Sequence, residues 1–350
     1  MSTLDQTDTP RHPNQQVADR IFRGALGFNI LLTALWLYSL VTGQSTMFFA
    51  TYGIDRDGLG RVASGILVFY VLWGLVWWAA KVALLRWFVG FTRDERRDAF
   101  SSRMQRPYDV AALTTRYSER RIRIADMIGR RGRFVTLAAA GFYYLYVEVR
   151  QNPTDQFALA FLQNNLFDAV AMAWVFLGLY YVNGFVAGLF YGPQSRVMDG
   201  VLARANCLLI TTLWVVFKFV MVPLGAALAG VYARNEFAVV FALIWGSYLV
   251  ADASAEIFGS LFGRQSLRVW GVGDVNRKSI VGVVAAFTAG LVFCVWVVAA
   301  HGLGGAWYGL SLALAASNTV LELYSPRGTD DFTMATANAL LCLAFGAWIV

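Results

Sequence analysis

Long apolar runs separated by short polar connections dominate the pattern of the chain. Nine runs have about the length that a ~30 Å hydrocarbon layer requires of a transmembrane helix. The third and sixth runs are short, whereas the fourth is long enough to cross with a tilt. We therefore expect an all-α fold, a polytopic membrane bundle of about nine helices. The runs cover residues 24–43, 62–88, 134–150, 158–191, 207–231, 237–251, 280–300, 306–324 and 335–350.

Composition agrees with this pattern. The chain has 350 residues, of which 58% are hydrophobic and 15% charged, whereas soluble domains carry about 25% charged residues. The three cysteines lie inside apolar runs without metal or redox spacing, and two histidines are too few for a histidine-based centre. We expect membrane lipids around the protein, and neither a nucleic acid nor an obligate protein partner.

Basic residues predict the orientation of the helices. The loop 92–133 contains twelve arginines and six acidic residues, and Leu113, Tyr117, Ile124 and Ile128 give it an amphipathic helical pattern. If this loop is cytoplasmic, loops on that side hold 22 Lys and Arg residues and the opposite loops hold four. We therefore expect a cytoplasmic N-terminus. The expected regions are a disordered arm 1–23, a transmembrane region 24–235 with the basic loop, and a C-terminal domain 236–350.

Two segments on the expected cytoplasmic side carry more polar groups than a connection needs. In the first, Asp252 and Glu256 share one helix face, and Lys278 stands at the start of the seventh span, where free N–H groups favour a phosphate. In the second, Asp330 and Asp331 precede the last span. Paired carboxylates suit Mg²⁺, which prefers oxygen ligands. Each feature alone has a simpler reading, as a helix cap, a topology signal or a solvated turn.

Taken in order, these residues resemble motifs of the dolichol kinase, phytol kinase and CTP-dependent diacylglycerol kinase family. That family has an Asp-Ala stretch, a Gly-Arg turn, a Lys-Ser-x-x-Gly motif at a helix start and an acidic motif before the last span. The resemblance covers about residues 240–350. The matching residues are Asp252, Glu256, Gly259, Gly263, Arg264, Arg277, Lys278, Ser279, Gly282, Glu322 and Asp330-Asp331-Phe332-Thr333.

The resemblance implies a kinase that transfers the γ-phosphoryl group of CTP, or of another NTP, to an isoprenoid alcohol or diacylglycerol at the cytoplasmic membrane face. It implies Mg²⁺ bound by Asp252, Asp330 and Asp331, and catalysis by Asp252, Glu256, Lys278 and Asp330. The implied phosphate-binding residues are Gly263, Arg264, Arg277, Lys278, Ser279 and Gly282. The chain departs from the family pattern at Ala251, Val281, Val283, Asp331 and Ala335, which leaves the lipid and the nucleotide open.

Two other functions fit parts of the pattern. A cytidylyltransferase would use similar metal and phosphate groups but transfer CMP to a lipid phosphate. A transporter is suggested by Lys218, a charge within an apolar run, with Asp168 as a possible partner. We expect Lys218, Asp168 and Glu322 to be structural or lipid-facing. No internal repeat supports a transporter, so the lipid kinase is the favoured hypothesis.

Overall fold

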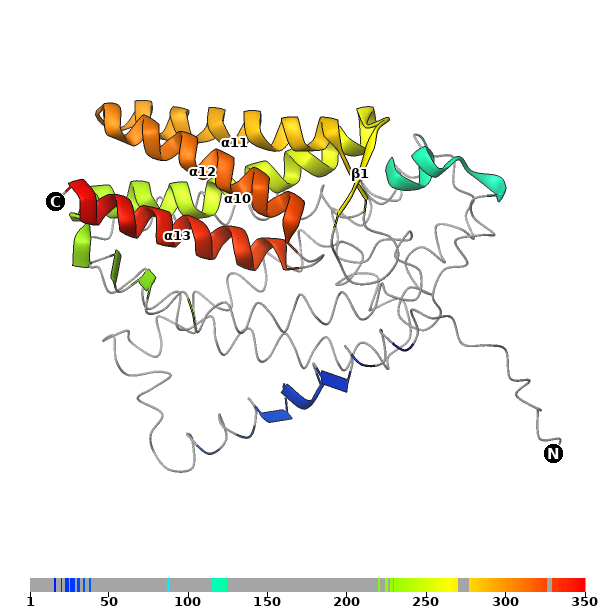
Figure 1. Ribbon diagram of the computed structural model, residues 1–350, viewed down its shortest axis with the longest axis horizontal. Helices are drawn as coiled ribbons and strands as arrows, with labels where there is room; N and C mark the ends of the chain where they lie inside the picture. Colours follow the sequence, from blue (N-terminus) through cyan, green and yellow to red (C-terminus); the bar gives the residue numbers. More distant parts are fainter. Residues whose placement is uncertain are drawn as a thin grey trace.

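The computed structural model describes residues 115–124, 231–269, 277–325 and 329–349, together with scattered positions before residue 231. This part of the chain is mostly helical, as the sequence predicted, and its main body is a group of four helices (Figure 1). The first five predicted spans, from 24–43 to 207–231, lie outside the continuously described ranges.

Helix α10 (Arg234–Phe262) is the longest helix of the group, with 29 residues. It runs eleven residues beyond the predicted span 237–251, so that prediction is corrected at its C-terminal end. The charge of Asp252 does not end the helix, because this side chain is buried against the neighbouring helices. The helix stops instead at Gly263, whose N–H bonds to the carbonyl of Gly259.

A short antiparallel hairpin connects α10 to the next helix. Its strands are β1 (Ser266–Arg268) and β2 (Arg277–Ser279), with Leu267 opposite Lys278 and Arg268 opposite Arg277. The sequence predicted only a loop here. Side chains alternate along a strand, so Lys278 and Leu267 share one face of the hairpin. That face is less exposed than the one that carries Ser266 and Arg268.

The last three helices follow with short connections. They are α11 (Ile280–Ala300), α12 (Gly305–Tyr324) and α13 (Asp330–Ile349). The first two agree with the predicted runs 280–300 and 306–324. Helix α13 begins five residues before the predicted 335, because Asp330 and Asp331 occupy its first turn, where carboxylates interact well with the helix dipole.

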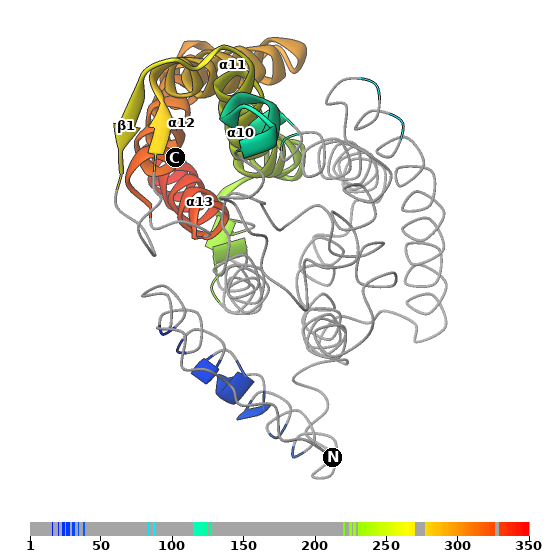
Figure 2. The same ribbon diagram turned by 90° about the vertical axis from the view of Figure 1, so that its right-hand side faces the viewer.

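The four helices alternate in direction, and α10 packs against all three others (Figures 1 and 2). Helix α10 and helix α11 are long and apolar enough to cross a membrane, and 72% of the α10 window is buried inside the protein against 28% for α11. Helix α11 therefore presents most of its apolar surface outward. The core between the helices contains Leu243, Leu314, Met334 and Ala339, all with no exposed surface.

Alternation brings four chain segments to one end of the group: the second half of α10, the hairpin, the end of α12 and the start of α13. We call this the hairpin end. Close packing between α10 and α11 depends here on glycine, since a Cβ added to Gly282 would lie 2.7 Å from the carbonyl oxygen of Ala255. The polar residues singled out in the sequence between Asp252 and Asp331 therefore meet at a single end of the bundle.

Candidate functional site

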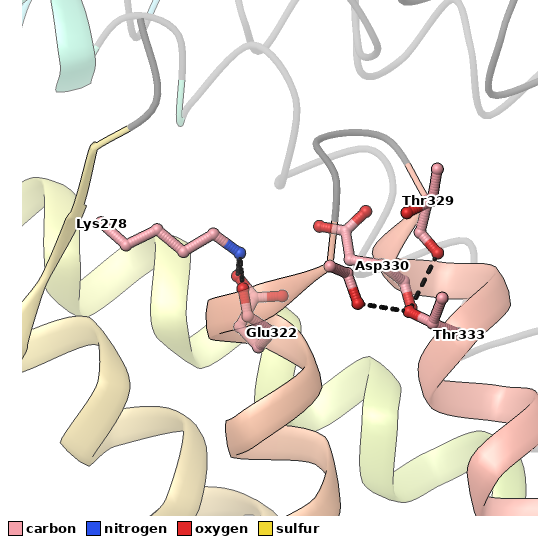
Figure 3. Close-up of polar contacts among 6 residues, drawn as sticks. Lys278, Glu322, Thr329, Asp330 and Thr333 are labelled. Carbon is pink, nitrogen blue, oxygen red and sulfur yellow. Dashed lines mark hydrogen bonds and ion pairs between the residues drawn. The ribbon is translucent and has the colours of Figure 1, made fainter. Parts of the chain in front are cut away.

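An ion pair between the hairpin and α12 lies at the centre of the hairpin end. The Nζ atom of Lys278 lies 2.6 Å from Oε1 of Glu322 and also donates to the backbone carbonyl of Glu322. This carbonyl belongs to the last turn of α12, where helix carbonyls lack partners within the helix. Lys278 therefore neutralises the carboxylate and caps the helix end at the same time (Figure 3).

The ion pair belongs to a group of three carboxylates from three different helices. Oxygen atoms of Asp252 in α10, Glu322 in α12 and Asp330 in α13 all lie within 4.8 Å of one another. Asp252 and Glu322 are 5% and 6% exposed, and Asp330 is only partly exposed. We call these three residues the carboxylate cluster. Figure 3 shows Glu322 between Lys278 on one side and Asp330 on the other.

The ammonium group of Lys278 balances part of the negative charge of the cluster. One carboxylate oxygen, Oε2 of Glu322, is buried without a hydrogen-bond partner in the described part of the chain. Burying a carboxylate oxygen without a partner is costly. Three carboxylates, one of which has a buried oxygen without a partner among the described residues, fit a hard divalent cation such as Mg²⁺.

Asp330 is held in place by its own helix turn. The hydroxyl of Thr333 donates to the carbonyls of Thr329 and Asp330, and it lies 2.5 Å from the hydroxyl of Ser325. These contacts tie the end of α12 to the start of α13 (Figure 3). The Asp330 carboxylate is therefore presented from a fixed turn and not from a loose loop.

Two predicted acidic residues lie outside the carboxylate cluster. Glu256 is one turn beyond Asp252 on α10, and Asp331 is the second residue of α13. Both are partly buried. Among the described residues the group within 4.8 Å contains Glu322 in place of Asp331. The sequence had assigned Glu322 only a structural or lipid-facing role.

Ser279 caps the start of α11. Its Oγ accepts a hydrogen bond of 3.0 Å from the N–H of Gly282, and the N–H of Ile280 bonds to the carbonyl of Gln265. Two of the first N–H groups of α11 are thus already used by the protein. A phosphate at this helix start would have to displace these contacts or rely on nearby cations.

The predicted glycines surround the same serine. A Cβ added at Gly259 would lie 2.7 Å from Ser279 Oγ, and one added at Gly263 would lie 2.6 Å from Ser279 Cβ. The motif glycines therefore serve close packing of the α10 end against the start of α11. This explains their spacing without a ligand.

The remaining predicted residues are distributed over and beyond this end. Arg264 is exposed just after α10, and Arg277 lies opposite Arg268 in the hairpin. Lys218 and Asp168 lie outside the described residues. Their pairing stays a prediction.

Part of the basic loop 92–133 lies beside the hairpin end. Arg120 donates from Nη2 to the carbonyl of Leu261 in the last turn of α10 at 2.9 Å, and Ile122 is fully buried. The helical pattern predicted for this loop is interrupted at Tyr117 and Ser118, where Ser118 Oγ accepts a hydrogen bond from the N–H of Arg121. Both views show this segment next to the end of α10 (Figures 1 and 2).

Sequence reasoning missed a second buried polar group, one to two turns deeper in the bundle. Ser247, Asn318 and Asn338 come from α10, α12 and α13, and none has exposed surface. The sequence carries a signal for this group, because amide side chains inside apolar helical runs are uncommon and usually have a structural or functional role. Asn318 also precedes Glu322 by four residues, which places the two on one face of α12.

Comparisons of the chain with protein-family models, with curated proteins and with solved structures gave no match. The kinase resemblance therefore rests on the motif residues themselves, and the geometry of the hairpin end carries the functional argument.

Proposed function

We propose that the chain is a multi-pass membrane phosphotransferase that moves the terminal phosphoryl group of a nucleoside triphosphate to the hydroxyl of a lipid alcohol. The observation that carries this proposal is the carboxylate cluster, three acidic groups from three helices within 4.8 Å. Phosphoryl transfer requires mainly positioning and neutralisation of charge. A cluster with a cation site beside a lysine supplies both.

The depth of the cluster supports a lipid acceptor. At ~1.5 Å per residue, Asp252 lies about 27 Å along the helix axis from the first residue of α10. Glu322 lies about 26 Å from the first residue of α12 by the same measure. In a hydrocarbon layer of ~30 Å, both carboxylates would lie close to one boundary. The hydroxyl of a long-chain alcohol lies at this depth, while a nucleotide would approach from the adjoining water.

The three carboxylates share one part in the proposed reaction, and Asp330 has a second. Asp252, Glu322 and Asp330 would hold Mg²⁺, which when bound neutralises charge on the phosphate oxygens. Asp330 is the most exposed of the three and accepts the hydrogen bond of the acceptor hydroxyl. Its carboxylate takes the proton as the new P–O bond forms and the bond to the nucleoside diphosphate breaks.

The cations of the hairpin end complete the proposed site. Lys278 holds the Glu322 carboxylate, and Arg264 and Arg277 belong to the segments at the same end. Arginine and lysine groups bind phosphate oxygens through charge-assisted hydrogen bonds. From the loop counts, we propose that this end faces the cytoplasm.

The proposal is tested with purified full-length protein, Mg²⁺, nucleotides labelled at the α or the γ position, and a panel of prenols and diacylglycerol. We expect γ label in the lipid product, loss of transfer in EDTA, and a decrease of about a hundredfold for Glu322→Gln. Glu236→Gln is the matched control, since Glu236 lies in the first turn of α10 at the opposite end. Transfer of the α label would indicate a cytidylyltransferase. Absence of any labelled lipid in a metal-binding preparation would refute the proposal.

A further inference from the structure

Ser247, Asn318 and Asn338 form a connected layer across the helix group, which we call the amide layer. The Nδ2 atoms of both asparagines donate to Oγ of Ser247, at 3.0 Å from Asn318 and 3.1 Å from Asn338. Asn338 Nδ2 also lies 3.1 Å from the carbonyl of Ile244. One serine oxygen thus connects α10, α12 and α13.

The amide layer and the carboxylate cluster use the same three helices. On α10, Ser247 precedes Asp252 by five residues, and on α12, Asn318 precedes Glu322 by four. On α13, Asn338 follows Asp330 by eight residues. At ~1.5 Å per residue these separations correspond to about 6–12 Å along the helices. Each of the three helices therefore contributes one residue to the amide layer and one to the carboxylate cluster. The amide layer lies farther from the hairpin end.

Buried polar contacts add to apolar packing in fixing the relative height and rotation of such helices. A buried polar group is satisfied in only a few arrangements, because a displaced donor or acceptor finds no water to replace its partner. Both asparagine donors converge on one acceptor, so a shift of either helix breaks a bond in the layer. Buried asparagines fix helix register in the same way in coiled coils.

Mg²⁺ makes the register of the carboxylates important. It requires near-octahedral ligands at about 2.1 Å, whereas Ca²⁺ accepts longer and less regular contacts. Three ligands from three helices meet this requirement only if the helices hold their relative positions closely. A loss of register should therefore weaken Mg²⁺ binding more than Ca²⁺ binding.

We propose that Ser247, Asn318 and Asn338 are positioning residues that set the register of α10, α12 and α13 and thereby select Mg²⁺ at the carboxylate cluster. This inference rests on the proposed metal site and adds the residues that determine its selectivity. The amide layer acts through the helices and touches neither the metal nor a substrate.

The test measures Mn²⁺ binding to the purified full-length protein from the electron paramagnetic resonance signal of free Mn²⁺, with Mg²⁺ and Ca²⁺ as competitors. We expect Ser247→Ala to weaken Mg²⁺ binding about tenfold and Ca²⁺ binding less than about threefold. Ser311→Ala is the matched control. Ser311 is equally buried, but its hydroxyl donates to the Trp307 carbonyl within α12. It should change neither affinity more than about twofold.

The outcomes separate the two proposals. If Mn²⁺ binding is lost in Asp252→Asn but is equal in Ser247→Ala and Ser311→Ala, the role of the amide layer is refuted and the metal site is retained. An equal loss of Mg²⁺ and Ca²⁺ affinity in Ser247→Ala would also refute it. If the unmodified protein binds no Mn²⁺, both the metal site and the positioning role are refuted. Should Ser247→Ala fail to fold, Asn318→Leu, which keeps the branching at Cγ and the number of side-chain heavy atoms, provides the same comparison.

Discussion

Replacing Lys278 by methionine would leave the Glu322 carboxylate buried without its counter-charge. The ion pair spans 2.6 Å, and the side chains are 25% and 8% exposed. Removing one partner of a buried pair typically costs about 3–5 kcal/mol. Because a quarter of the Lys278 side chain contacts solvent, we expect the lower end of this range, about 3 kcal/mol of unfolding free energy.

A second substitution distinguishes this cause from a loss of packing. Replacing both partners by apolar groups is often nearly neutral, so adding Glu322→Leu to Lys278→Met should restore about 2 kcal/mol. Equilibrium unfolding of the full-length protein in mixed micelles with increasing dodecyl sulfate measures these values. EDTA must be present so that no metal compensates the free carboxylate.

The matched control for this cycle is Arg268→Met. Arg268 is an exposed cation on the neighbouring strand, and its loss should change the unfolding free energy by no more than about 0.5 kcal/mol. A cost below about 1 kcal/mol for Lys278→Met, or simple additivity in the double variant, would show that the ion pair does not stabilise the hairpin end.

Two further predictions concern packing and topology. Gly282→Ala should lower the unfolding free energy by about 1–3 kcal/mol, because the new methyl group meets the backbone of Ala255. At Gly309 an added Cβ would meet no atom of another described segment within 4 Å, so Gly309→Ala should be neutral or stabilising in the same unfolding assay. Equal effects of the two substitutions would argue against the close approach of α10 and α11. Reporters inserted near Arg106 and near Gly302 should read as cytoplasmic and extracytoplasmic, respectively, and reporters on the same side would contradict the proposed nine-span arrangement.

The sequence predicted α11 and α12 to within one residue because their apolar runs end at polar or turn-forming residues. It placed the end of α10 too early, since a charge usually leaves the hydrocarbon and only tertiary contacts reveal that Asp252 is buried. The three-residue strands of the hairpin carry no alternating pattern long enough to detect.

Within the candidate site, the sequence linked Asp252 with Asp330 through their common side of the membrane. It could not show that Glu322 joins them, because the contact with Lys278 connects residues 44 positions apart. The amide layer was missed for the same reason. A single asparagine in an apolar run indicates a structural or functional role. Its hydrogen-bond partners on other helices can be identified only from the packing of the helices.

The distribution of the carboxylate cluster over three helices has a consequence for biosynthesis. Asp252, Glu322 and Asp330 are synthesised in that order, and the last of them begins α13. A nascent chain halted before Asp330 holds two of the three acidic groups and only half of the Asn318 and Asn338 pair. Under the proposed function, a chain truncated before Asp330 could not consume nucleotide. Catalytic competence would thus depend on the synthesis of α13.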